Sequence, residues 1–115
     1  VLEPRSCLYN IAVPVVLPAD TPLKVTVEPD MAALKLYGGV WIKVHGSAQQ
    51  GAGISDIIGC VHGRFVAFEV KRPDGIYKIS PRQQLFLEKV SQAGGIAAVI
   101  VSPDEAIEIL EHHGL

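Results

Sequence analysis

The chain has 115 residues, which is room for one domain with a single hydrophobic core and excludes a second domain. Apolar residues make up 49% of it and charged residues 19%, a composition typical of globular rather than disordered or fibrous chains. The apolar runs fall short of the roughly 20 residues that span a bilayer, so we expect no membrane association. The net charge of -2 argues against holding nucleic acid through overall charge.

The sequence contains two cysteines, Cys7 and Cys60, without the spacing of a zinc ribbon or a redox motif. Cys60 lies in a strand-like run, where we expect it to serve as a small buried apolar residue. The first residues show no secretory signal. These features together predict a reducing, cytoplasmic setting.

Prolines interrupt residues 1–28, so we expect an extended arm of undetermined role there, with one strand over Lys24 to Glu28. The folded domain is predicted to occupy residues 29–115. From Asp30 the apolar spacing predicts a short helix that Gly38 and Gly39 terminate.

Residues Val40 to Val44 alternate apolar side chains with Trp41, Lys43 and His45, which predicts a strand. Gly46 to Gly53 holds three glycines and two glutamines without apolar periodicity. We expect this segment to be a surface loop.

Two strand-like runs follow, over Asp56 to Val61 and Arg64 to Lys71. Only His62 and Gly63 separate them, which predicts a tight β-hairpin. If these two residues are the centre of the turn, Asp56 lies directly opposite Glu69.

The remaining elements have clear start and stop signals. Ser80 and Pro81 are an N-cap and a first-turn proline for a helix running to about Ala93. Ile96 to Val101 is a continuous apolar run typical of a buried strand, and a last helix is predicted from Ser102 to about His112. This order predicts an α/β fold with a mixed sheet, in which an antiparallel hairpin lies beside a strand reached through a helical crossover.

Asp56, Glu69 and Lys71 are the candidate reactive residues. Carboxylates that face each other across a strand pair destabilise a sheet unless a cation lies between them, and Mg²⁺ commonly binds one or two carboxylates plus phosphate and water. Strand alternation places Lys71 on the same face as Glu69. This combination of a metal and a cation suits phosphodiester hydrolysis.

The alternative interpretation is a half-exposed strand face of alternating charge, with Asp56 capping the strand start. The flanking run Phe65 to Val70 is hydrophobic enough to be an interior strand, where a charge is costly without a partner. This context favours the metal site.

Four motifs carry a family resemblance. In order, they are GISDIIG at 53–59, GRFVAFEVKRP at 63–73, SPRQ at 80–83 and Gly94-Gly95. Together they resemble the VRR-NUC nucleases of the PD-(D/E)XK superfamily, over about residues 36–110. KVHG at 43–46 is similar to the segment before the acidic motif in phage members. The chain departs from the family pattern at Ser55, where members usually carry proline, and in its N-terminal arm.

The resemblance implies a PD-(D/E)XK core and a nuclease dependent on Mg²⁺, with Mn²⁺ as a substitute. It implies that Asp56, Glu69 and the backbone carbonyl of Val70 hold the metal, and that Lys71 is the catalytic lysine. It also makes Gln83 part of the site. For Gln83 a solvated first-turn residue is the alternative, and its neighbour Gln84 is the obvious misassignment.

Further residues are candidates for the edge of the site. Lys43, His45 and Arg72 are candidates for contacts with nucleic acid, although a lone histidine such as His45 is as often structural or solvated. Family members carry a glutamate on the first helix that reaches the site. Glu28, followed by Pro29, is the candidate for that position.

The function implied is a DNA endonuclease acting on branched or structured DNA in replication or repair, in the cytoplasm of a phage host or bacterium. Paired incisions across a junction require two active sites, so we expect a homodimer. The competing hypotheses are a module that keeps the fold and binds nucleic acid or supports assembly without cutting, and a small-molecule phosphohydrolase.

Overall fold

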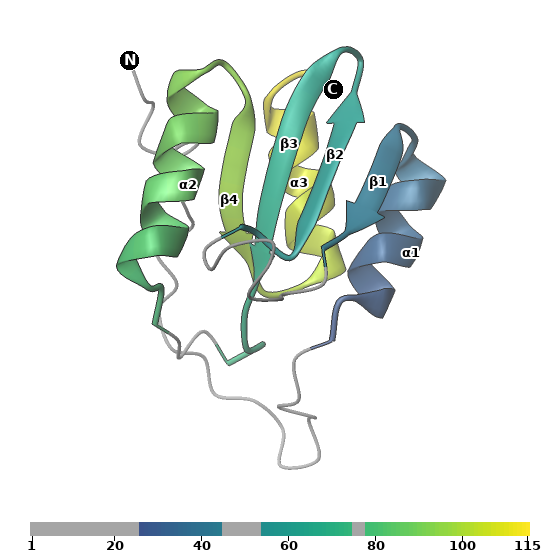
Figure 1. Ribbon diagram of the computed structural model, residues 1–115. Coiled ribbons are helices and arrows are strands. Elements are labelled where there is room, and N and C mark those ends of the chain that lie inside the picture. The colour runs from purple at the N-terminus through teal and green to yellow at the C-terminus, as the bar shows by residue number, and fades with distance from the viewer. Residues whose placement is uncertain (1–25, 45–53, 75–77) are drawn as a thin grey trace.

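The computed structural model describes residues 26–44, 54–74 and 78–115. The described residues form a four-stranded sheet and three helices in three layers, with α2 on one face of the sheet and α1 and α3 on the other (Figure 1). The elements in chain order are α1 (Glu28–Tyr37), β1 (Val40–Lys43), β2 (Ile57–Val61), β3 (Arg64–Val70), α2 (Pro81–Gln92), β4 (Ile96–Ile100) and α3 (Pro103–His112).

The sheet is mixed, as the sequence predicts. Its strands lie in the order β1-β2-β3-β4, with β1, β2 and β3 pairing antiparallel. β4 pairs parallel with β3, and the chain passes from β3 to β4 through the crossover helix α2. A parallel neighbour requires such a crossover, whereas an antiparallel one needs only a short turn.

The hairpin between β2 and β3 has the predicted register. His62 and Gly63 both have positive φ, at 50° and 77°, as a two-residue primed turn requires. Val61 pairs with Arg64, and the ladder continues to Ile57 opposite Phe68. The next positions along the two strands are Asp56 and Glu69.

The predicted strand over Lys24 to Glu28 is wrong in its described part. Glu28 opens helix α1 instead, with Pro29 in its first turn, where the fixed φ of proline suits a helix. The rest of the predicted arm, residues 1–25, lies outside the described residues, as does the predicted surface loop over 46–53.

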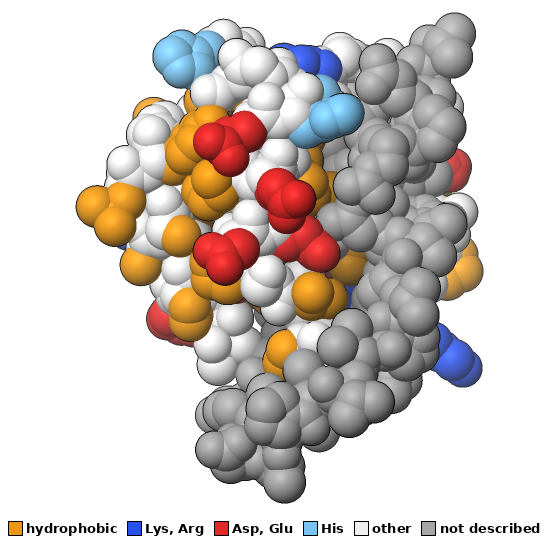
Figure 2. Space-filling view, turned by 180° about the vertical axis from the view of Figure 1, so that it is seen from behind, with side chains coloured by type: hydrophobic (Ala, Val, Ile, Leu, Met, Phe, Trp, Pro, Cys, Tyr) orange, Lys and Arg blue, Asp and Glu red, His pale blue; other side chains and the backbone are white. Residues whose placement is uncertain are grey.

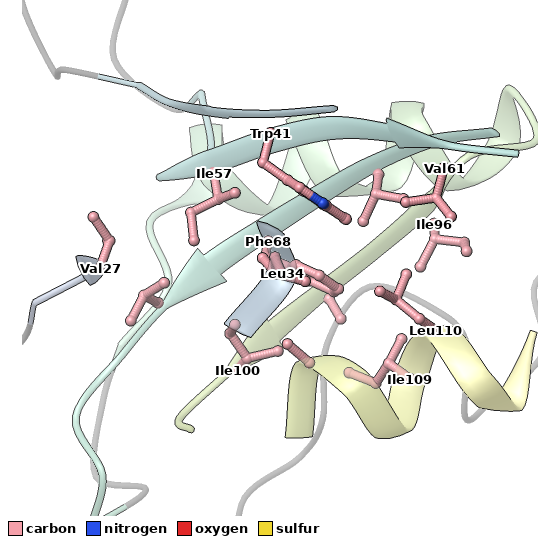
Figure 3. Close-up of a cluster of buried hydrophobic side chains, with 14 residues drawn as sticks. Val27, Leu34, Trp41, Ile57, Val61, Phe68, Ile96, Ile100, Ile109 and Leu110 are labelled. Atoms are coloured by element: carbon pink, nitrogen blue, oxygen red, sulfur yellow. The ribbon is translucent and has the colours of Figure 1, made fainter. Parts of the chain in front are cut away.

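Apolar side chains pack on both faces of the sheet. On the α1 and α3 side, Trp41 stacks on Phe68 with ring centroids 6.2 Å apart, within a core that Figure 3 shows converging from the sheet and helices. Gly59 makes room for this stack, because a Cβ there would collide with the Trp41 ring and the carbonyl of Val40. On the other face, Leu87 and Val90 of α2 pack on the sheet.

Helix α2 packs against β3 and β4. Cys60 of β2 is therefore exposed, and the expectation that it is a buried apolar residue is wrong.

No helix among the described residues is long and apolar enough to cross a membrane.

Acidic side chains gather on the face that α3 covers, as Figure 2 shows. Asp104, Glu108 and Glu111 of this helix are exposed. The acidic end of the sequence is thus placed on the opposite side of the sheet from α2.

Candidate active site

The candidate site lies where β2 begins, β3 ends and α2 starts. Asp56 immediately precedes β2, Glu69 lies in β3, Lys71 follows β3, and Gln83 is in the first turn of α2. Ala67, two residues before Glu69, packs in the cluster under α2, so alternation turns Glu69 to that same face. The start of β2, the end of β3 and the first turn of α2 therefore bring four polar side chains together at one end of the sheet.

Glu69 is the centre of this group and is 3% exposed. Its Oε2 accepts a hydrogen bond from Gln83 Nε2 at 2.6 Å and lies 3.3 Å from Lys71 Nζ. Its Oε1 is buried without a hydrogen-bond partner. A buried carboxylate oxygen in this state is costly, which points to a ligand for that oxygen.

Burial raises the pKa of Glu69 to about 7, and the neighbouring Asp56 carboxylate adds to the rise. Lys71 opposes this effect by favouring the ionised form. The two carboxylates are thus close enough to interact, as expected for facing positions of the hairpin. A cation between them would counteract both effects by favouring the ionised carboxylates.

Asp56 is held by the backbone on either side of it. Its Oδ2 accepts from the N–H of Val70 at 2.8 Å, and its carbonyl oxygen accepts from the N–H of Val44 at 2.8 Å. The carboxylate therefore takes the place of a backbone carbonyl in the β2–β3 pairing. The hydrogen bond from Val44 ties the main chain of Asp56 to the residue that follows β1. Val70 contributes its N–H here, and the metal contact of its carbonyl stays a prediction.

Lys71 is positioned by the parallel strand. Its N–H donates to the carbonyl of Ile100 at 3.0 Å, which extends the β3–β4 pairing by one residue beyond the strand end. Its side chain is 19% exposed, with Nζ 3.5 Å from Gln83 Oε1 as well as near Glu69. The ammonium group therefore lies beside the carboxylate and keeps access to the surface.

Gln83 links the helix to the carboxylate. Ser80 and Gln83 form a capping box, in which the Ser80 hydroxyl accepts from the N–H of Gln83 and the Gln83 side chain accepts from the N–H of Ser80. Gln84 is exposed. The choice of Gln83 over Gln84 thus agrees with the geometry.

These residues fit a magnesium ion. Mg²⁺ typically takes one or two carboxylates and fills its other positions with water and substrate phosphate, so a pair of carboxylates suffices. Within the described ranges, no group of three or more histidine, cysteine, aspartate or glutamate side chains gathers as a metal cage. The unpartnered Glu69 Oε1 beside Asp56 is the oxygen that such an ion would satisfy.

The structure places Glu28 and Lys43 away from this centre. Glu28 forms an exposed ion pair with Lys43, 2.7 Å long, and Lys43 shares the alternation of the core residue Trp41, on the face opposite Glu69. Arg72 pairs with Asp74. His45 lies outside the described residues.

Two features have little or no signal in the sequence. Asp30 is 3% exposed with Oδ1 unpartnered, and burial raises its pKa to about 6, although it reads as an ordinary first-turn acid. It belongs to α1, which packs on α3 and β1 and not on the site. Ser80 is recognisable as an N-cap, but its link to Glu69 through Gln83 depends on how α2 docks.

No family model matches the chain, and neither a curated protein nor a solved structure matches it, so the resemblance to the VRR-NUC nucleases stays a prediction.

Proposed function

We propose that this chain is a metal-dependent nuclease of the PD-(D/E)XK type that hydrolyses phosphodiester bonds in DNA. The observation that carries the proposal is the buried Glu69 carboxylate. One of its oxygens is held by Gln83 and Lys71, and the other is unpartnered next to Asp56. A buried carboxylate beside a second, half-buried acid is unfavourable, and a divalent ion bound between them would offset that cost.

The fold supports this proposal. An antiparallel hairpin carries the acidic pair, and a parallel strand reached through α2 holds Lys71 by its backbone. A mixed sheet flanked by helices, with this hairpin at its centre, is the arrangement implied by the PD-(D/E)XK resemblance. Asp56, Glu69, Lys71 and Gln83 come from three of the four motifs of that resemblance and lie together at one end of the sheet, which supports the proposal.

Each residue has a defined role in the proposed reaction. Asp56 and Glu69, with the carbonyl of Val70, would hold Mg²⁺ or Mn²⁺, which when bound lowers the pKa of water and neutralises charge on phosphate. The Lys71 ammonium stabilises negative charge that develops as water attacks the phosphorus. Gln83 fixes the orientation of Glu69 by its hydrogen bond to Oε2.

Charge distribution favours a polyanionic substrate on the site side of the molecule. The exposed acids of α3 lie on the opposite side of the sheet from α2 and would repel a DNA backbone there. We further propose that the substrate is branched or structured DNA and that the active form is a homodimer, because paired incisions need two sites.

The decisive experiment incubates the protein with labelled linear, flap and four-way-junction DNA in Mg²⁺, Mn²⁺ or EDTA. We expect cleavage that requires the divalent ion and favours one of the branched substrates. Glu69→Gln serves as the inactive control. DNA binding without cleavage under every condition would instead identify a silent binding module. Cleavage of none of these DNAs, but of a small phosphodiester assayed in parallel, would identify a phosphohydrolase.

A further inference from the structure

The orientation of the Gln83 side chain is determined by Ser80. The N–H of Ser80 donates to Gln83 Oε1 at 3.0 Å, and the Ser80 hydroxyl accepts from the N–H of Gln83 at 3.1 Å. A backbone N–H can only donate, so the atom that faces it must be the amide oxygen. The amide nitrogen is thereby turned toward Glu69, where it donates to Oε2 at 2.6 Å.

The opposite orientation of the amide is strongly disfavoured. A flip would place the Gln83 NH₂ group against the N–H of Ser80 and near the Lys71 ammonium. It would also turn the amide oxygen toward the carboxylate of Glu69. All three contacts would then be repulsive, whereas the observed orientation satisfies all three.

We propose that Ser80 is a positioning residue of the active site, acting through Gln83 on Glu69. Because the Gln83 amide group meets Oε2 as a donor, this oxygen is occupied. Oε1 is then the oxygen left for the metal ion that the proposed function places between Glu69 and Asp56. The inference rests on the proposed function in one respect, which is that the ligand of Glu69 Oε1 is a divalent metal ion. Its structural part, the orientation of the Gln83 amide, can be measured in the metal-free protein.

Ser102 offers a matched control. It caps α3 in the same manner, since its hydroxyl accepts from the N–H of Glu105 at 3.2 Å. The Glu105 side chain in turn accepts from the N–H of Val101 at 2.9 Å. α3 lies on the other face of the sheet, so Ser102→Ala removes a comparable cap without touching the site.

The test compares the wild-type protein with Ser80→Ala, Ser80→Thr, Ser80→Pro and Ser102→Ala. Ser80→Thr keeps a capping hydroxyl. Ser80→Pro removes both the hydroxyl and the N–H, and the φ of -68° at Ser80 already suits a proline ring. The readouts are urea denaturation, the side-chain amide NMR signals of Gln83 in EDTA, and calorimetric binding of Mn²⁺ alone.

Ser80→Ala and Ser102→Ala should lose similar stability, but only Ser80→Ala should shift the Gln83 amide signals, because without the hydroxyl the first turn of α2 holds Gln83 less firmly against the N–H of Ser80. If the lost cap lowers the population of the binding-competent Gln83 orientation by its usual worth, Ser80→Ala should weaken Mn²⁺ binding by about fivefold. Ser80→Pro should weaken Mn²⁺ binding further. Ser80→Thr should keep both the Gln83 amide signals and the Mn²⁺ affinity close to those of the wild type.

Wild-type Gln83 signals and Mn²⁺ affinity in both Ser80→Ala and Ser80→Pro would overturn the proposal and leave the cap purely structural. That result would not touch the proposed nuclease function. Conversely, Mn²⁺ binding that depends on Ser80 in a protein that cuts no DNA would refute the nuclease function and leave the positioning role intact.

Discussion

Replacing Glu69 by glutamine should stabilise the metal-free protein at alkaline pH. Burial and the Asp56 charge raise the pKa of Glu69 from 4.5 to about 7. At 1.36 kcal/mol per pKa unit, ionised Glu69 lowers the free energy of unfolding by about 3 kcal/mol above pH 7. The pKa of about 7 already includes the favourable ion pair with Lys71, and a neutral glutamine can still accept from Gln83, so the variant should recover most of that free energy.

The sign of the pH dependence follows from the raised pKa. Between pH 4.5 and about 7 the folded state binds more protons than the unfolded state, so the stability of the wild type falls as pH rises. Glu69→Gln carries no such proton. We therefore expect a gain of about 3 kcal/mol at pH 8 and only about 1 kcal/mol at pH 5.

Urea denaturation in EDTA at both pH values measures this difference. Asp30, whose pKa is also raised, affects both proteins equally and cancels in the comparison. With excess Mg²⁺ the wild type should become more stable, whereas Glu69→Gln should not respond. A glutamine variant less stable than the wild type at pH 8, or a gain of equal size at both pH values, would refute the burial of an unneutralised carboxylate.

Three further variants test the site and its support. Lys71→Met should slow single-turnover cleavage by roughly 10²-fold with a modest loss of DNA affinity, because the ammonium acts on charge in the transition state; weakened binding with unchanged cleavage would reduce Lys71 to a phosphate contact. Gln83→Leu should weaken Mn²⁺ binding in calorimetry, whereas Gln84→Leu, at an exposed position, should leave it unchanged; equal effects would contradict the assigned role. Gly59→Ala should cost about 1–3 kcal/mol in urea denaturation, because its methyl group meets the Trp41 ring, and a neutral result would mean that the stack can shift.

Much of the fold could be predicted because its signals are local. His62 and Gly63 determine the turn type and hence the pairing that brings Asp56 opposite Glu69. The Ser-Pro pairs at 80–81 and 102–103 mark both helix starts. At the hairpin and at these two helix starts, neighbouring residues decide the conformation, and the prediction and the structure agree.

The rest depends on which face each helix covers. Cys60 is exposed because α2 packs on β3 and β4, and no strand pattern contains that information. Glu28 meets Lys43 because α1 lies on the opposite face of the sheet from Glu69. The burial of Asp30 has the same origin, since a first-turn acid is ordinarily solvated.

The four residues of the site fall within residues 56–83, yet they are completed at different stages of folding. A two-residue hairpin closes within microseconds, and at that stage both carboxylates are still hydrated. We expect the burial of Glu69 to be completed later, when α2 crosses over and β4 pairs with β3, because contacts of longer range form more slowly. On this expectation, the charge of Glu69 opposes the docking of α2 and β4 rather than the closing of the hairpin, and a divalent ion would favour the native chain most strongly at that step.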